Sequence, residues 1–195
     1  VDSTFTNNSG SLGGAIYNSV STINIIADGS NVSFTGNTAG ANSGAIHQSS
    51  NTSRNAVLNL NAETYAVGDD VLARSIVIND AVTGATQAND GGYSTYININ
   101  KSGLTYTDVD GNTQNIGTGG EYYFNNTVSG NNVNLYNGAN VYLGTNTQSG
   151  TTYYGVFNLE NFGLTNDTHN GSINTQNFHI DAQNLGTVNL ASDLY

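Results

Sequence analysis

Four residue types are absent from the 195-residue chain, namely cysteine, proline, methionine and tryptophan. Without cysteine there is no disulfide bond to stabilise the chain outside the cell, so its stability has to come from packing and hydrogen bonding. Proline cannot donate a backbone hydrogen bond and is confined to sheet edges and bulges. A chain without proline is therefore what we expect when nearly every strand is paired on both sides.

Basic residues are also scarce. Arg54, Arg74 and Lys101 stand against 14 acidic residues, and the formal net charge is −11. Three cations cannot neutralise a row of phosphates, which excludes nucleic acid as a partner. The same scarcity argues against an anionic membrane surface. No apolar run exceeds three residues, so we expect no direct membrane insertion by this segment and no signal peptide.

Asparagine, glycine, threonine and serine make up about half of the sequence, and hydrophobic residues make up 36%. The hydrophobic residues occur mostly in short alternating runs bounded by Gly, Asn, Asp and Ser, which is typical of β-strands. No segment has the apolar spacing of a helix, so we expect essentially none. The predicted strands are residues 20–26, 56–61, 73–79, 93–100, 120–124, 133–136, 141–143, 153–159, 178–182 and 188–190.

The first 50 residues contain an internal duplication with a period of 29 to 30 residues. Phe5 and Asn8 are followed by the sequence Gly-Gly-Ala-Ile at residues 13–16, and Phe34 and Asn37 are followed by Ser-Gly-Ala-Ile at residues 43–46. Repeats of this length are too short to bury their own apolar faces, and they are typical of stacked, solenoid architectures.

A second duplication lies in the middle of the chain. Residues 78–84 match residues 124–130 in the order apolar, Asn, Asn or Asp, any residue, Val, Ser or Thr, Gly. The two segments are 46 residues apart. We interpret this separation as two coils of about 23 residues.

These features favour a single all-β domain over residues 1–195, a parallel β-helix. In such a solenoid only the two ends are sheet edges, so edge-protecting charges and prolines are not needed. Asn side chains can bond to one another from coil to coil, and Asn and Gly tolerate the left-handed backbone of tight corners. We predict about eight coils stacked at about 4.8 Å. Regular repeats occupy residues 1–52, and less regular coils with longer corner loops occupy residues 53–195.

The F-x-x-N and G-G-A-I combination, carried by Phe5, Asn8 and residues 13–16, resembles the repeats of chlamydial polymorphic outer-membrane proteins and of bacterial autotransporter passenger domains. The second copy has Ser43 in place of the first glycine. The resemblance covers about a quarter of the chain. It implies a right-handed parallel β-helix that is exported through the outer membrane and is extracellular or on the bacterial cell surface. Members of these families usually act in adhesion, self-association or surface coating.

The stretch most like a metal site is Asp108-Val109-Asp110-Gly111-Asn112. It places Asp108, Asp110 and Asn112 at alternate positions, as in calcium loops. The glutamate that such a loop needs about 12 positions from its first Asp is missing, because position 119 is glycine. The flanking residues look like strand ends, which favours a hairpin or corner turn at Asp110-Gly111. We therefore predict no bound metal and no cofactor.

Catalytic residues are not evident either. Asp69 and Asp70 form a carboxylate pair like those of β-helical glycan hydrolases, but His169 lies in a polar turn with no basic residue near it. The chain has no Ser in a nucleophile motif and no Cys. The histidines, at positions 47, 169 and 179, are far apart in sequence. We predict a protein without enzymatic activity, and a glycan-degrading enzyme is the weakest alternative.

Four tyrosines are candidates for ligand binding. If the apolar residues beside them in each strand face the core, the two-residue period of a strand turns these tyrosines outward. Rigid, exposed rings suit the recognition of a sugar or a protein. Alternatively, the rings stack on neighbours and stabilise the sheet. The four residues are Tyr96, Tyr123, Tyr136 and Tyr142.

The function favoured by the sequence is that of an adhesive and structural rod, with a glycan or protein of a host or bacterial surface as its partner. A self-associating extracellular filament or coat component is the alternative, in which the chain binds copies of itself through open coil ends or along a polar face.

Overall fold

The computed structural model describes residues 2–40, 44–84, 91–136, 139–143, 145–148, 151–154, 156–165, 179–180 and 188–190. In these ranges all regular secondary structure is β-strand and no helix occurs, so the predicted all-β class is confirmed. The same ranges accordingly contain no apolar helix of the length needed to span a membrane.

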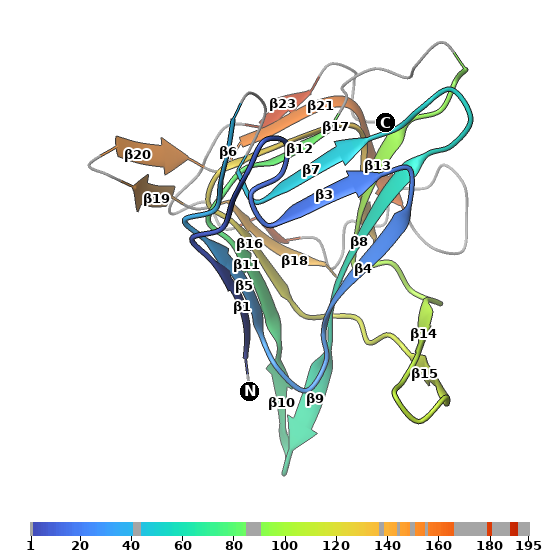
Figure 1. Ribbon diagram of the computed structural model, residues 1–195. Helices are drawn as coiled ribbons and strands as arrows, with labels where there is room; N and C mark the ends of the chain where they lie inside the picture. Colours follow the sequence, from blue (N-terminus) through green and yellow to red (C-terminus); the bar gives the residue numbers. More distant parts are fainter. Residues whose placement is uncertain are drawn as a thin grey trace.

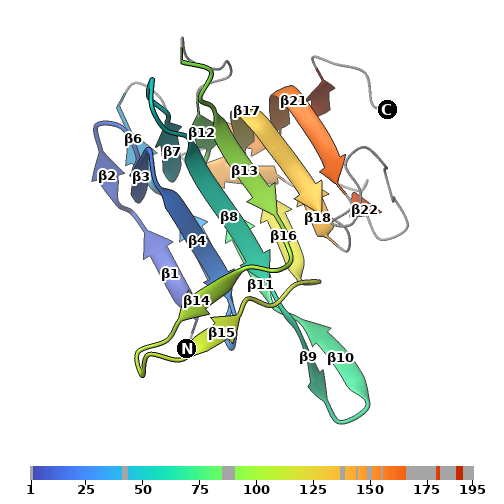
Figure 2. The same cartoon turned by 90° about the vertical axis from the view of Figure 1, so that its right-hand side faces the viewer.

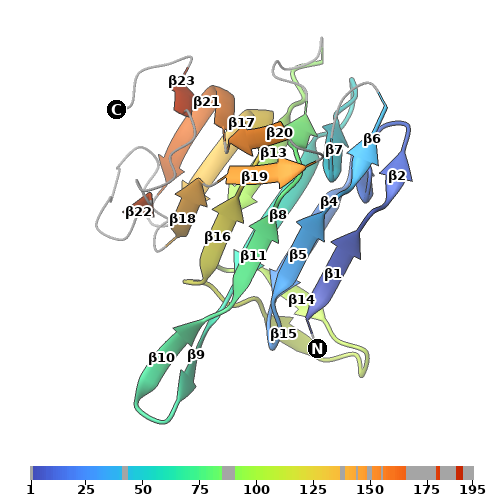
Figure 3. The same ribbon diagram turned by 90° about the vertical axis from the view of Figure 1, so that its left-hand side faces the viewer.

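Among the described residues the first sheet contains six strands, and all neighbouring strands in it are parallel (Figure 1, Figure 3). Alternate residues face the core, so that Ile76 and Ile78 of β11 are buried while Ser75 and Val77, which alternate with them, are half-buried. In spatial order the strands are β1 (Ser3–Thr6), β5 (Val32–Thr35), β11 (Ser75–Ile78), β16 (Glu121–Phe124), β18 (Asn140–Leu143) and β22 (His179–Ile180).

The second sheet, in the part of the chain that the structure describes, contains nine strands, also paired in parallel. The central strand β17 pairs with β12 through its first half and with β13 through its second half, and so joins two rows, β3-β7-β12 and β4-β8-β13. The strands are β3 (Ile16–Ser19), β4 (Thr22–Ala27), β7 (Ile46–Ser49), β8 (Ala56–Ala62), β12 (Val82–Gly84), β13 (Thr95–Ile99), β17 (Thr127–Tyr136), β21 (Val156–Thr165) and β23 (Val188–Leu190).

The chain passes repeatedly from one sheet to the other. It runs from β1 through the short β2 (Ser9–Gly10) to β3 and β4, and it returns to the first sheet at β5, which pairs with β1. The next passage follows the same path through β6 (Thr38–Ala39), which pairs with β2, to β7 and β8. Parallel neighbours need such crossovers, because a hairpin joins only antiparallel strands. The two sheets enclose the core between them (Figure 1, Figure 2).

The N-terminal duplication corresponds to two neighbouring passages. Phe5 pairs with Phe34 in the first sheet, and Ile16 pairs with Ile46 in the second. The two phenyl rings stack with their centroids 4.5 Å apart. The repeated positions are therefore those at which like side chains meet between one passage and the next.

The glycines of the duplicated G-A-I element lie where the chain enters the second sheet and where neighbouring passages come closest. The Gly14 N–H donates to the Gly44 carbonyl oxygen over 2.9 Å. A Cβ at Gly14 would lie 2.7 Å from that oxygen, and a Cβ at Gly44 would overlap the backbone nitrogen of Ala81. Only a residue without a side chain fits this spacing.

The asparagines of the F-x-x-N element form a polar column at a corner. Asn8 Nδ2 donates to Asn37 Oδ1 over 2.8 Å, and Asn37 Nδ2 donates to Asp80 Oδ2 over 2.7 Å. Asp80 is only 3% exposed, and its carboxylate also accepts the backbone N–H groups of Gly36 and Asn37. The column thus extends beyond the duplicated repeats into the third passage.

The second duplication also joins direct neighbours, which corrects the predicted spacing. Ile78 pairs with Phe124, and Val82 pairs with Val128. Because β11 pairs directly with β16, the two copies lie in neighbouring strands and not two steps apart. The separation of 46 residues is a single step from strand to neighbouring strand.

Antiparallel hairpins take up the additional chain length. They are β9 (Thr64–Val67) with β10 (Asp70–Ala73), β14 (Thr105–Thr107) with β15 (Thr113–Asn115), and β19 (Thr145–Gln148) with β20 (Thr151–Tyr154). The first two leave the sheets at the same end of the molecule (Figure 1, Figure 2). In the described ranges the first sheet accordingly has six strands, and three of the steps between them contain a hairpin.

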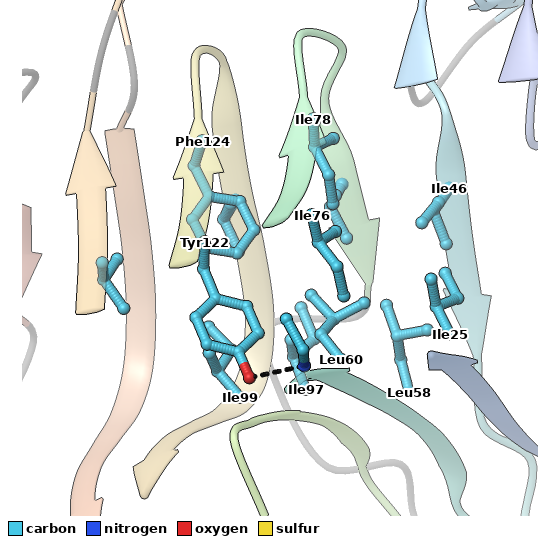
Figure 4. Packing of buried hydrophobic residues seen from close by; sticks show 14 of the residues in the cluster. Ile25, Ile46, Leu58, Leu60, Ile76, Ile78, Ile97, Ile99, Tyr122 and Phe124 are labelled. Carbon is cyan, nitrogen blue, oxygen red and sulfur yellow. Dashed lines mark hydrogen bonds between the residues drawn. The ribbon is translucent and has the colours of Figure 1, made fainter. Parts of the chain in front are cut away.

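The core consists of aliphatic and aromatic side chains from the inner faces of both sheets (Figure 4). Tyr122 is fully buried there, and its hydroxyl accepts the Ala62 N–H over 2.9 Å and donates to Asn100 Oδ1 over 3.0 Å. Burial raises the pKa of this hydroxyl far above its ordinary value, so it stays protonated. Its polar group is therefore satisfied inside an apolar core.

A ladder of four asparagine side chains runs across the outer face of the second sheet, one from each of β4, β8, β13 and β17. Asn59 donates to Asn24 over 2.8 Å, Asn98 donates to Asn59 over 2.8 Å, and Asn134 donates to Asn98 over 2.9 Å. Asn59 and Asn98 are buried, and Asn24 is exposed. The ladder ends beyond Asn134 because its partner in β21 is Gly163, which has no side chain. Asparagine side chains were predicted to bond to one another between neighbouring passages of the chain, and here they do so between neighbouring parallel strands.

Candidate functional site

Two of the four candidate tyrosines meet on the outer face of the first sheet. Tyr123 of β16 pairs with Tyr142 of β18, and their rings are stacked with centroids 4.5 Å apart and planes 10° apart. The Tyr123 hydroxyl donates to Glu121 Oε2 over 2.7 Å. Both residues are half-buried. The stacking that the second interpretation expects is present for this pair, and each ring turns one of its faces to the other ring.

The other two candidate tyrosines lie in the second sheet. Tyr96 of β13 pairs with Val57 and Asn132 of the neighbouring strands, and Tyr136 lies at the end of β17, where the Lys101 ammonium is 5.9 Å from its ring centroid. Both are half-buried. The structure therefore distributes the four tyrosines over two sheets and does not bring them together on one face.

The acidic stretch at residues 108–112 forms the turn of the hairpin β14–β15, as the sequence favoured. The Asp108 carboxylate accepts the backbone N–H groups of Asp110 and Asn112 over 3.0 and 2.8 Å and the Gln114 side-chain amide over 2.8 Å. The Gln114 bond, with those from Asn112 and Asp110, holds the pKa of Asp108 below its ordinary value. Both carboxylate oxygens are thus used within the turn. The described residues contain no cluster of three His, Cys, Asp or Glu that could hold a metal.

The carboxylate pair considered for glycan hydrolysis lies at the tip of the other hairpin. Asp69 is in the turn between β9 and β10, Asp70 begins β10, and both are exposed. His169 lies outside the described residues. The pair is therefore on a protruding turn of the molecule.

Histidine 47 lies on the outer face of the second sheet. Its ring stacks on Tyr17, with 5.8 Å between centroids, and its Nδ1 lies 2.9 Å from Thr83 Oγ1. Burial lowers the pKa of its imidazole. These contacts join three neighbouring strands, β3, β7 and β12, and suit a structural role.

Exposed apolar side chains concentrate on the two hairpins at one end of the molecule, which we call the hairpin end (residues 64–73 and 105–115). In β9–β10, Val71 is 73% exposed, Val67 is 54% exposed and Leu72 is 44% exposed. Val109, at the turn of β14–β15, is fully exposed. In the described part of the chain, the other exposed large apolar side chains are Leu12 and Tyr17. In the register of β9–β10, Val67 and Leu72 share one face of the hairpin and Val71 lies on the other. Exposed apolar patches are typical of interaction surfaces.

The base of β9–β10 is fastened to the sheets by one charged cluster. Glu63 Oε1 accepts the Gly29 N–H over 2.7 Å and lies 3.7 Å from Arg74 Nε. The Arg74 guanidinium lies over the Tyr65 ring, 3.9 Å from its centroid. A two-stranded hairpin alone is marginally stable in water, so these contacts help to hold its exposed tip in one direction.

The second hairpin is fastened at Tyr106, whose hydroxyl lies 3.4 Å from Asp28 Oδ2. Desolvation, followed by the negative charge of Asp28, raises the pKa of this hydroxyl. The turns of both hairpins carry carboxylates, Asp69 and Asp70 on one and Asp110 on the other. The hairpin end therefore presents apolar tips framed by negative charge.

Sequence reasoning missed β9–β10, although the chain carries a signal for it. Two short apolar runs flank Gly68-Asp69, and a two-residue connection with glycine is typical of a β-hairpin. Gly68 has a φ of 62°, which such turns require and which glycine adopts without strain. We considered this stretch only for the carboxylates of Asp69 and Asp70 and did not predict the hairpin.

Comparison of the chain with protein-family models, with curated proteins and with solved structures finds no match. The fold class of the described residues is all-β, with two parallel sheets and antiparallel hairpins beside them.

Proposed function

We propose that the two sheets are the faces of one right-handed parallel β-helix with six layers. Three observations support this: the parallel pairing, the passage of consecutive strands from one sheet to the other, and the stacking of like side chains between neighbouring passages. Crossovers between parallel strands are right-handed in about 98% of cases, which supports the handedness.

We infer that this solenoid is a non-catalytic, adhesive and structural segment of a bacterial surface protein. The observation that carries the adhesive part is the gathering of exposed apolar side chains at the hairpin end. The structural part is supported by the asparagine ladder and the Asn8–Asn37–Asp80 column, which use polar side chains to join neighbouring strands. The secreted, cell-surface location is supported by the resemblance of the N-terminal repeats to autotransporter passengers.

The chemistry of the hairpin end favours a protein over a glycan as the partner. Val67, Val71 and Leu72 are aliphatic, whereas sugar binding relies on exposed aromatic ring faces. The carboxylates of Asp69 and Asp70 beside them complement a cationic rim. We therefore expect a host or bacterial surface protein with an apolar patch bordered by Lys or Arg.

Adhesion of beads coated with the chain to epithelial cells and to bacterial cells tests this function. Val67→Ser with Leu72→Ser, two side chains on the same face of β9–β10, should lower bead retention about tenfold or more. Desolvation of two aliphatic side chains contributes about 1.5 kcal/mol or more each when complete, and tenfold is about 1.4 kcal/mol. Thr35→Ser with Thr38→Ser, at exposed positions of β5 and β6 outside the hairpin end, is the matched control and should leave retention unchanged.

The tyrosine pair provides the competing surface in the same assay. Tyr123→Ser with Tyr142→Ser should lower thermal stability, because the stacked pair is lost, and leave bead retention unchanged. Loss of retention in this variant alone would move the adhesive site to the first sheet. Failure of the unaltered chain to bind any of the cells would refute the adhesive function.

A further inference from the structure

The outer edge of β10 is a free strand edge at the hairpin end. In the described part of the chain β10 pairs only with β9, and the hairpin projects away from both sheets (Figure 3). The Arg74 N–H donates to the Glu63 carbonyl oxygen over 2.8 Å, so every second residue from Arg74 toward the turn faces β9. Val71 and Ala73 therefore turn their backbone N–H and C=O groups to the outer edge. Val71 is 73% exposed, so this part of the edge is accessible to a partner.

The outer edge of β9 is already occupied at its base. The Thr64 N–H, which points away from β10, donates to the Thr118 carbonyl oxygen over 3.1 Å. Glu63 also forms a β-bridge with Gly119. The segment after β15 thus lies along the start of β9, and a strand adding to that edge would have to displace it. Of the two edges of the hairpin, the one on β10 is therefore the better template for a further strand.

The side chains of β10 define the kind of strand that fits its edge. Val71 lies on one face of the hairpin, and Asp70 and Leu72 lie on the other. A paired strand sets one residue opposite each of them, on the same face. An aliphatic residue suits the position opposite Val71, and a Lys or Arg suits the position opposite Asp70. A second Lys or Arg can lay its apolar stem along the exposed Leu72.

We propose that the partner of the hairpin end binds by strand addition. An extended protein segment, in which aliphatic residues alternate with Lys or Arg, pairs antiparallel with β10 and adds a third strand to the hairpin. Its residue opposite Val71 donates an N–H to the Val71 carbonyl oxygen and accepts the Val71 N–H. A two-stranded hairpin alone is marginally stable in water, so the added strand also stabilises the hairpin.

Charge favours a foreign cationic segment over a second copy of the chain as the occupant of this edge. Each copy carries a net charge of −11, and Asp69 and Asp70 lie at the turn itself. Two hairpins brought together edge to edge would therefore repel each other, whereas a Lys- or Arg-bearing segment is attracted. Strand addition rests on the proposed adhesive function of the hairpin end and specifies the segment that is bound there.

Fluorescence anisotropy with a fluorescein-labelled peptide tests the proposal. The probe is Lys-Val-Lys-Val-Lys with an amidated C-terminus, and a second probe has the same sequence with both valine nitrogens methylated. The methylated peptide cannot donate to the β10 carbonyl groups, so its dissociation constant should be about tenfold higher or more. The two peptides carry the same charge, so their comparison separates backbone pairing from charge attraction. Equal binding of both peptides, or no binding of the first, overturns the proposal.

Two proline variants of the chain test the edge itself. Val71 and Ala66 lie directly opposite each other, and each turns its N–H away from the other strand. Proline at either position removes that N–H and no hydrogen bond between β9 and β10. Val71→Pro should raise the dissociation constant of the first peptide about tenfold or more, and Ala66→Pro, the matched control, should leave it unchanged. Val71→Ala keeps the N–H and should weaken binding less than Val71→Pro.

Equal binding of the first peptide by the two proline variants overturns the assignment to β10. If Val71→Pro does not fold, the comparison of the two peptides on the unaltered chain still decides. The bead assay separates this proposal from the adhesive function. Beads that carry Val71→Pro and are retained as well as the unaltered chain refute strand addition and leave adhesion standing. Edge-specific peptide binding without any bead retention upholds strand addition and refutes adhesion.

Discussion

Replacement of Asn98 by alanine tests whether the asparagine ladder holds neighbouring strands together. Asn98 is 5% exposed, donates to Asn59 over 2.8 Å and accepts from Asn134 over 2.9 Å. Alanine removes both bonds and leaves the Asn59 carbonyl oxygen without its donor, in a residue that is 3% exposed. A net hydrogen bond contributes about 1 kcal/mol, and a buried polar group left unsatisfied costs about 1–3 kcal/mol. We therefore expect N98A to lower the free energy of unfolding by about 2–4 kcal/mol.

The matched control is Asn24→Ala at the exposed end of the same ladder. This change removes one bond, and because Asn24 is exposed, water can take its place beside the Asn59 amide, so the expected cost is about 0.5–1 kcal/mol. Urea unfolding followed by far-ultraviolet circular dichroism measures both variants. If N98A costs no more than N24A, the ladder is incidental to stability and the reasoning is refuted. A double-mutant cycle between Asn59 and Asn98 isolates the energy of their bond.

Three further changes test other parts of the fold. Gly44→Ala should destabilise the chain by about 1–3 kcal/mol by overpacking a backbone contact, while Gly40→Ala, which has more room, should cost less in the same urea experiment. Burial lowers the pKa of His47 in the folded chain, so below about pH 6.5 the unfolded chain binds more protons at this residue than the folded chain does. The free energy of unfolding should therefore fall on acidification, and it should fall less in His47→Gln. Unfolding at about pH 7.5 and at about pH 5.5 measures the difference. Gln114→Ala should raise the depressed pKa of Asp108 toward its ordinary value of 3.8, as measured by a carboxyl NMR titration. The stability that is linked to this depressed pKa is present above pH 3.8 and is lost as the pH falls through the pKa of the folded chain.

Most of the sheet structure could be predicted because it depends on alternation and repetition, both of which are visible in a single sequence. The matched positions of Phe5 and Phe34 indicated which residues stack, and the structure pairs them directly. The match between the segments of Ile78 and Phe124 was visible in the sequence, but we predicted that they lie two coils apart, whereas they pair directly. The number of strands in a sheet cannot be read from chain length alone, since a hairpin inserted between two strands lengthens the step between them without adding a strand to the sheet.

The candidate site was harder to predict. The two-residue period of a strand predicts that Tyr123 and Tyr142 point outward, and they do. It does not predict that their rings stack on each other or that Tyr96 and Tyr136 lie in the other sheet. Those relations depend on which strands become neighbours. The exposed valines of the hairpin end were not predicted, because apolar residues that alternate in a short strand are expected to face a core. The hairpin β9–β10 has only two strands, and Val71 on it is exposed.

The hairpin β9–β10 has a consequence for engineering. Gly68 lies at its turn, and a Cβ there would contact nothing within 4 Å. Strand pairing in the two sheets is set on both sides of the hairpin and does not pass through its tip. A foreign loop inserted between Gly68 and Asp69 should therefore be displayed away from the two sheets and leave the strand registers of both sheets unchanged.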